Sequence, residues 1–149
     1  MTSKEKNDIL YVCSLIEYTG RKTHNRNADI VKIIGKDELA WQLEYADVSH
    51  CMSFEETTDE LIEKFNISKG NFDAVGACKY DVPKYIAIAG VYKRLIANLV
   101  SSFEEVIDTM YDVFTSFISD EISNFNTSTF YENPSFIYHS YLNGELPND

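Results

Sequence analysis

The sequence predicts an all-α protein: a single-domain bundle of about six helices that ends in an aromatic C-terminal arm. Three observations predict this class. Apolar residues recur at spacings of three and four along most of the chain, and no convincing stretch alternates apolar and polar residues as a half-buried strand does. Residues typical of helix starts and ends separate the periodic stretches. We expect the bundle to span residues 1–122 and the arm residues 123–149 of one domain.

Four helices are expected in the first half of the chain. The apolar periodicity predicts them over residues 7–22, 28–34, 37–51 and 54–65. Asn27 is the expected N-cap of the second helix, and Gly35 its expected end, because glycine readily adopts the left-handed conformation that closes helices. Ser53 and Glu56 match the pattern of a capping box at the start of the fourth helix. Residues 66–77 are expected to form a loop.

Two longer helices are expected in the second half. Residues 82–99 carry Pro83 in their first turn, where the missing N–H of proline is tolerated. Residues 101–118 show an unusually broad apolar face opposite a row of acids. The seam of that face is formed by Phe103, Val106, Met110, Val113 and Phe117. Because so broad a face needs a deep core or a partner, we expect this helix to organise the fold and predict a homodimer through it.

The C-terminal arm is expected to end in a short helix over residues 135–142. Pro134 suits the first turn of that helix, and Gly144 suits the position just after its end. Its aromatic side chains, which are too many for a solvated tail, include Phe136, Tyr138 and Tyr141. Aromatic anchors of this kind mark contact surfaces, so the arm packs either on its own bundle or on another subunit.

The net charge of −11 is unevenly distributed along the chain. Residues 1–36 carry a small excess of basic side chains, whereas residues 101–149 hold nine acids and no Lys or Arg. The phosphate charge of nucleic acids is repelled by such a surface. Nonspecific binding of nucleic acids by the whole surface is therefore not expected. A local basic patch near the N-terminus is the one region whose charge would allow it.

The three cysteines, Cys13, Cys51 and Cys78, are an odd number and show no CxxC spacing. This pattern predicts a reducing, cytoplasmic setting rather than a disulfide scaffold. The longest apolar runs are far too short to span a bilayer, so no membrane association is expected.

Four short stretches in the first half carry a resemblance to a known family. They are Ile16-Glu17, Asp29-Ile30-Val31, Asp47-Val48-Ser49-His50 and Thr58-Asp59-Glu60. Over about residues 9–65 the chain resembles a family of short helical bacterial domains of unknown function. Such domains are often encoded beside ADP-ribosyltransferase-like, toxin-type proteins. The resemblance therefore implies a regulatory, antitoxin-like role toward a partner, and it implies no catalytic residue.

The first candidate site is a basic cluster between two predicted helices. It comprises Arg21, Lys22, His24 and Arg26. Guanidinium groups and the free N–H groups of the following helix start can bind a phosphate or a carboxylate. Three alternatives stand beside this reading: a solvated loop, internal pairing with the acidic C-terminal half, or docking of an acidic segment of a partner.

The second candidate is a metal site formed by Asp47, His50 and Cys51. On a helix, Asp47 lies one turn from both other residues, so carboxylate, imidazole and thiol can converge. The alternative is that His50 ends its helix, where a cation suits the helix dipole, and that Cys51 is a small buried residue. A row of acids, Glu56, Asp59, Glu60 and Glu63, has the spacing of Mg²⁺-binding carboxylates and equally that of a solvated helix face.

No P-loop, GxGxxG or Ser/His/Asp order occurs at diagnostic spacing. We therefore expect no cofactor and favour a non-catalytic module that acts through protein–protein contact, with itself or another protein. The alternative hypothesis is a metal-dependent enzyme or binder of a nucleotide or another phosphorylated small molecule.

Overall fold

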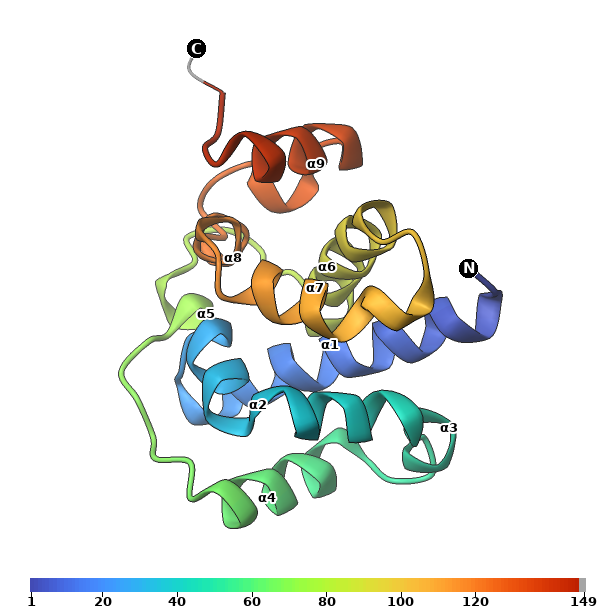
Figure 1. Cartoon of the computed structure of the whole chain (residues 1–149). Helices are drawn as coiled ribbons and strands as arrows, with labels where there is room; N and C mark the ends of the chain where they lie inside the picture. The colour runs from blue at the N-terminus through green and yellow to red at the C-terminus, as the bar shows by residue number, and fades with distance from the viewer. Residues whose placement is uncertain (148–149) are drawn as a thin grey trace.

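The computed structural model describes residues 1–147, and within that range every regular element is a helix, which confirms the all-α class (Figure 1). α1 (Ser3–Thr23) runs through the middle of the molecule. Three helices pack on it: α2 (Asn27–Glu44), α4 (Phe54–Phe65) and α6 (Tyr85–Leu99), of which α6 makes the most extensive contact. No described helix is long and apolar enough to cross a membrane.

A second layer covers the far side of α2 and α6. α7 (Val106–Phe114) packs across both of them, while α9 (Pro134–Asn143) packs on α6 and on α8 (Phe117–Ser123). The remaining short elements are α3 (Ala46–Ser49), α5 (Ala74–Ala77) and two 3₁₀ turns at Phe103–Glu105 and Thr129–Tyr131. The expected arm thus folds back on its own chain as far as it is described. Residues 148–149, its last two, lie outside the described residues.

α1 starts earlier than the periodicity predicts because its N-terminus carries its own cap. The Thr2 hydroxyl accepts a hydrogen bond from the Glu5 N–H at 3.1 Å, and the Glu5 carboxylate accepts one from the Thr2 N–H at 2.9 Å. These reciprocal bonds satisfy two N–H groups that the helix cannot satisfy itself. At the other end His24 closes the helix in the left-handed conformation, with φ of 57°.

Gly35 breaks the next helix as predicted. It has φ of 79° and ψ of 171°, so α2 consists of two helical pieces that meet at a kink. The second piece ends at Glu44 rather than near residue 51, because Tyr45 leaves the helical conformation before the short helix α3 begins. Ser53 caps α4 by accepting a hydrogen bond from the Glu56 N–H at 3.1 Å, as its position predicts. The expected loop 66–77 contains one additional turn, α5.

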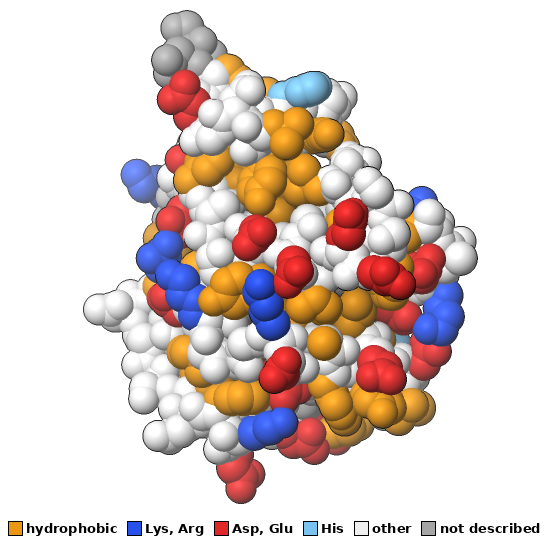
Figure 2. All heavy atoms as spheres, in the orientation of Figure 1, with side chains coloured by type: hydrophobic (Ala, Val, Ile, Leu, Met, Phe, Trp, Pro, Cys, Tyr) orange, Lys and Arg blue, Asp and Glu red, His pale blue; other side chains and the backbone are white. Residues whose placement is uncertain are grey.

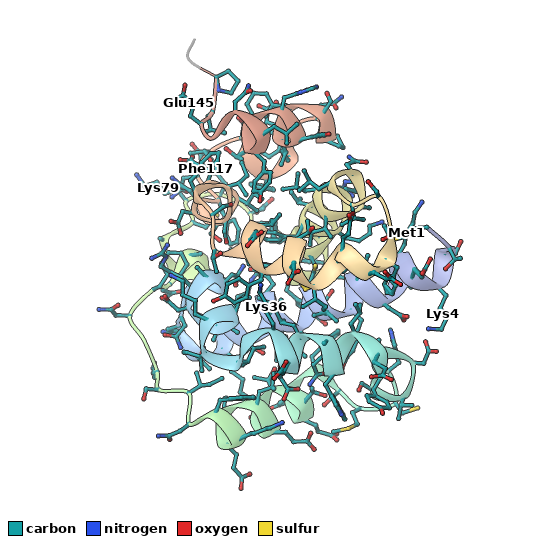
Figure 3. All side chains as sticks on the ribbon, in the orientation of Figure 1. Met1, Lys4, Lys36, Lys79, Phe117 and Glu145 are labelled. Atoms are coloured by element: carbon teal, nitrogen blue, oxygen red, sulfur yellow. The ribbon has the colours of Figure 1, made fainter. Side chains whose placement is uncertain are left out.

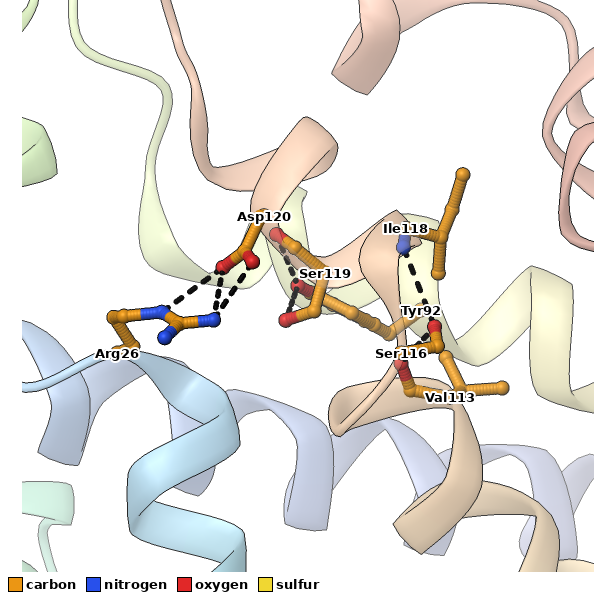
Figure 4. Close-up of polar contacts among 7 residues, drawn as sticks. All are labelled: Arg26, Tyr92, Val113, Ser116, Ile118, Ser119 and Asp120. Atoms are coloured by element: carbon orange, nitrogen blue, oxygen red, sulfur yellow. Dashed lines mark hydrogen bonds and ion pairs between the residues drawn. The ribbon is translucent and has the colours of Figure 1, made fainter. Parts of the chain in front are cut away.

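The prediction of one long helix over residues 101–118 was wrong. The segment begins as a 3₁₀ turn, continues as α7 and breaks at Thr115 and Ser116 before α8. Both hydroxyls donate to carbonyl groups of the preceding turn, Thr115 to Tyr111 and Ser116 to Val113, each at 2.7 Å. The Ser116 hydroxyl also accepts from the Ile118 N–H and so caps α8 (Figure 4). Side-chain hydroxyls that compete for backbone groups end a helix that hydrophobic periodicity alone would continue.

The core is continuous from α1 to α9. The largest side chains that it buries completely include Ile9, Ile16, Tyr92 and Phe114, and Ile137 of α9 belongs to the same cluster. The rings of Tyr92 and Phe114 stack with their centroids 4.1 Å apart, which joins α6 to α7.

Candidate functional site

The basic cluster predicted between the first two helices is engaged in internal contacts. Arg21 donates to the Glu17 carboxylate at 2.7 Å and to the Pro83 carbonyl at 2.8 Å. Lys22 pairs with Asp59 at 2.8 Å, and Arg26 pairs with Asp120. His24 supplies the left-handed end of α1. Internal pairing is therefore observed for three of the four residues, but only Arg26 pairs with the acidic C-terminal half, whereas Arg21 and Lys22 pair within the first half. An incoming anion would have to displace a carboxylate from each of these three groups.

The predicted metal site does not assemble. Asp47 pairs with Lys4 at 3.2 Å, the His50 ring packs on Tyr11, and Cys51 is exposed. No group of three or more His, Cys, Asp or Glu side chains converges anywhere in residues 1–147. Asp47 and His50 keep their one-turn spacing in the short helix α3 and its C-cap, but Lys4 pairs with Asp47, and the exposed Cys51 does not line the pocket that the other two residues share.

The seam predicted as a dimer contact lies inside the protein. Val106, Met110 and Val113 are fully buried, and Phe103 and Phe117 are partly buried against the same core. Helices α2 and α6 of the same chain occupy the surface that the homodimer prediction assigned to a second copy. The aromatic residues of α9 are likewise partly buried against the core; they are Phe136, Tyr138 and Tyr141.

A large pocket lies elsewhere, where α1, α3, α4 and the start of α6 meet. It has a volume of about 530 Å³ and opens to the surface. Its walls are formed by Lys4, Asn7, Asp8, Leu10, Tyr11, Ser14, Asp47, His50, Phe54 and Ile86, and we call it the Tyr11 groove. A large, mainly apolar pocket with a few converging polar groups is the usual form of a ligand site.

Stacked rings form the apolar wall of the Tyr11 groove. The Tyr11 ring lies between His50, with centroids 4.8 Å apart, and Phe54, at 5.3 Å. Phe54 in turn meets Tyr85 edge to face at 5.5 Å, and Tyr85 meets Tyr18 at 5.3 Å. These aromatic contacts orient the Tyr11 ring within the wall of the groove.

The hydroxyl of Tyr11 is the unusual polar atom of the groove. Only 4% of Tyr11 is exposed, and its hydroxyl has no hydrogen-bond partner in the described part of the chain. Leaving a buried hydroxyl unpaired costs about 1–3 kcal/mol. Such a group is satisfied in a folded protein by an ordered water or by a bound ligand.

Charged groups line the rim of the groove and neutralise one another in part. Lys4 lies between Asp8, at 2.7 Å, and Asp47, at 3.2 Å, and so connects α1 with α3 (Figure 3). Hydrogen bonds to these two carboxylates raise the pKa of the Lys4 ammonium above its ordinary value. Asp8 is buried, so its carboxylate depends on Lys4 for a counter-charge. The rim therefore carries a net charge of about −1 when His50 is neutral.

Two polar side chains of the groove already make contacts within the chain. The Ser14 hydroxyl donates to the Leu10 carbonyl at 2.7 Å, so its proton is not directed toward His50. The imidazole of His50 packs against Tyr11 with the two ring planes tilted by 42°. The groove offers a ligand an aromatic wall, an aliphatic side chain at Ile86 and a mildly acidic rim. The Tyr11 hydroxyl is buried, so a ligand reaches it only when the side chains that cover it move.

Sequence reasoning found two residues of this site, Asp47 and His50, but assigned them to a metal. It missed Tyr11 and Phe54 because aromatic residues at helical spacing usually belong to a core. Three tyrosines of the following stretch lie in different surroundings: Tyr80 is exposed, Tyr85 joins the aromatic cluster and Tyr92 is buried.

No protein-family model, curated protein or solved structure matches the chain.

Proposed function

We propose that this protein is a non-catalytic interaction module that binds a segment of a partner protein in the Tyr11 groove. The observation that carries the proposal is the buried Tyr11 hydroxyl, which has no hydrogen-bond partner among residues 1–147 and belongs to a side chain that lines a groove of about 530 Å³. A peptide backbone or polar side chain satisfies that hydroxyl, while an apolar side chain of the same segment packs on Phe54 and Ile86. An antitoxin-like form of this function requires that the partner is an enzyme inhibited by the contact.

Charge favours a basic partner over a second copy of this chain. The net charge is −11, and acidic side chains gather over α7 beside apolar surface (Figure 2). Two such molecules repel each other, whereas a basic protein is attracted and steered toward the surface. Internal pairing of Arg21, Lys22 and Arg26 adds to this asymmetry, because their charges are already compensated. The same pairing leaves the hypothesis of a phosphorylated small-molecule ligand without a supporting observation.

The experiment is selection of binding peptides from a random display library, followed by titration of the purified peptides. Ile86 lines the groove and is 48% exposed, so Ile86→Asp places a charge in the groove at little cost to folding. We expect this variant to lose about tenfold or more in affinity, the loss typical of a central apolar contact. Ile33→Asp is the matched control, because Ile33 is 43% exposed on α2 and does not line the groove.

Equal affinity of wild type and Ile86→Asp for the selected peptides would contradict the proposal. Analytical ultracentrifugation tests for self-association. If the wild type self-associates and Ile86→Asp does not, the ligand of the groove is a second copy of this chain rather than a basic partner.

A further inference from the structure

A second pocket lies between α2 and α4, on the other side of α1 from α6 in the layered arrangement (Figure 1). Its volume is about 120 Å³, enough for a group of a few heavy atoms. Glu38, Trp41, Gln42, Glu60 and Lys64 line it together with two smaller side chains, and we call it the Gln42 pocket. Only 4% of Gln42 is exposed, yet its Oε1 has no hydrogen-bond partner among residues 1–147.

The orientation of the Gln42 amide follows from its neighbour. Its Nε2 donates to Glu38 Oε2 at 2.9 Å, while Glu38 Oε1 accepts from Lys64 Nζ at 2.7 Å. A carboxylate can only accept hydrogen bonds, so the amide nitrogen must face Glu38 and the amide oxygen must be the unpaired end. Gln42 lines the pocket, so its wall holds a buried acceptor that lacks a donor within residues 1–147 and that a ligand reaches when the side chains covering it move.

The other walls favour a donor that is also a cation. Glu38 and Lys64 compensate each other, which leaves the Glu60 carboxylate as the uncompensated charge of the pocket. Trp41 is 50% exposed, and its ring packs on Tyr45 with centroids 4.8 Å apart. An indole face attracts cations, and it attracts the planar guanidinium group in particular because that group also stacks.

We propose that the Gln42 pocket binds a guanidinium group, supplied by an arginine side chain of a protein partner. A guanidinium carries five N–H donors in one plane, so it can lie against Trp41 and donate to both Gln42 Oε1 and Glu60. An ammonium group lacks the flat face that matches the indole. Arginine as the source rests on the proposed interaction function, whereas binding of the guanidinium group itself does not.

Trp41 provides the readout, because it is the only tryptophan of the chain. Its fluorescence is followed while the protein is titrated with the blocked tripeptide acetyl-Ala-Arg-Ala-amide at constant ionic strength. Peptides with citrulline or lysine in place of arginine are the matched ligands, since citrulline keeps the shape without the charge. We expect saturable binding of the arginine peptide, several-fold weaker binding of the lysine peptide and no binding of the citrulline peptide.

Two variants show whether the response comes from this pocket. Glu60→Gln should weaken binding of the arginine peptide about threefold to fivefold, the effect of one exposed ion pair. Glu63→Gln removes the same charge from an exposed position on the same helix outside the pocket and should leave affinity unchanged. No saturation, equal binding of citrulline or lysine, or equal losses in both variants would overturn the proposal.

The outcome is independent of the Tyr11 groove. Binding of the arginine peptide that survives Ile86→Asp supports the Gln42 pocket even if no peptide occupies the groove. Equal affinity for free agmatine and for the tripeptide would overturn the assignment to a protein side chain, because a small amine would then be an equally good ligand.

Discussion

Arg26 and Asp120 form a two-pronged ion pair between the turn that joins α1 to α2 and the helix α8 (Figure 4). Nε and Nη2 of Arg26 lie 3.0 Å and 2.8 Å from Asp120 Oδ1, and Nη2 lies 2.7 Å from Oδ2. The contact links positions 94 residues apart and raises the pKa of the Arg26 guanidinium through its hydrogen bonds to Asp120. Together with the pair of Lys36 and Asp108, it joins basic side chains of the first half to acids of the second half.

We predict that Asp120→Asn lowers the free energy of unfolding by about 0.5–1 kcal/mol at low salt. The value is modest because both side chains are about half exposed, so solvent screens the pair. Urea unfolding of the wild type and the variant at low and at high salt measures this loss. The difference in unfolding free energy between the two proteins should shrink as salt is added. Glu121→Gln removes a neighbouring charge that forms no ion pair in the described structure, and an equal loss there would contradict a specific role for the pair.

Gly70 packs so closely on the end of α1 that a larger residue cannot fit. Its N–H donates to the Thr23 carbonyl at 2.9 Å, and an added Cβ would collide with the His24 carbonyl oxygen. Gly70→Ala should therefore destabilise the protein by about 1–3 kcal/mol in urea unfolding.

Gly90 provides the matched control for this substitution. It lies within α6, and an added Cβ would meet only the Arg94 guanidinium at an ordinary 3.4 Å. Gly90→Ala should stabilise the protein by about 0.5–1 kcal/mol, because alanine is the better helix former. Destabilisation of both variants to the same extent would contradict the close approach at Gly70.

The buried phenol of Tyr92 makes the free energy of unfolding depend on pH in the alkaline range. Burial, reinforced by the nearby Glu17 carboxylate, raises the pKa of its phenol above the ordinary value of 10.0. In the unfolded chain this phenol loses its proton near pH 10, whereas in the folded protein it keeps it. The stabilisation is therefore complete below pH 10 and is lost as pH rises further, by about 1.4 kcal/mol per pH unit.

Tyr92→Phe isolates this contribution. The variant loses the hydrogen bond between the Tyr92 and Ser119 hydroxyls, 2.9 Å apart, and should be about 1 kcal/mol less stable at neutral pH. Between pH 10 and pH 11.5 its unfolding free energy should fall less steeply than that of the wild type. Parallel curves for the two proteins over this range would refute the assignment.

The predicted class and several helix limits are confirmed because they depend on neighbouring residues. Gly35 and Ser53 act where the sequence places them, since each controls backbone groups within one turn. The break at Ser116 was missed because Val113 and Phe117 maintain the apolar spacing across it, while the hydroxyl that interrupts the helix acts through hydrogen bonds.

The candidate site depends on contacts that no local pattern encodes. The Tyr11 groove draws on residues from Lys4 to Ile86, on four separate helices. An unpaired hydroxyl is defined by the absence of every neighbour that could satisfy it, so only a three-dimensional structure reveals it. The partners of Arg21 and Arg26 are hidden for the same reason, because their contacts with Pro83 and Asp120 cross the whole fold.

The central claim is that the Tyr11 hydroxyl binds a ligand. It is tested most directly by measuring the stability and the peptide affinity of the Tyr11→Phe variant. The substitution removes only the unpaired oxygen, so the free energy of unfolding should rise by about 1 kcal/mol, while affinity for a groove-binding peptide should fall about threefold to tenfold. Tyr18→Phe, in the same aromatic cluster but outside the groove, should leave peptide affinity unchanged. Unchanged peptide affinity in Tyr11→Phe would contradict the account, because the hydroxyl would then have no role in recognition.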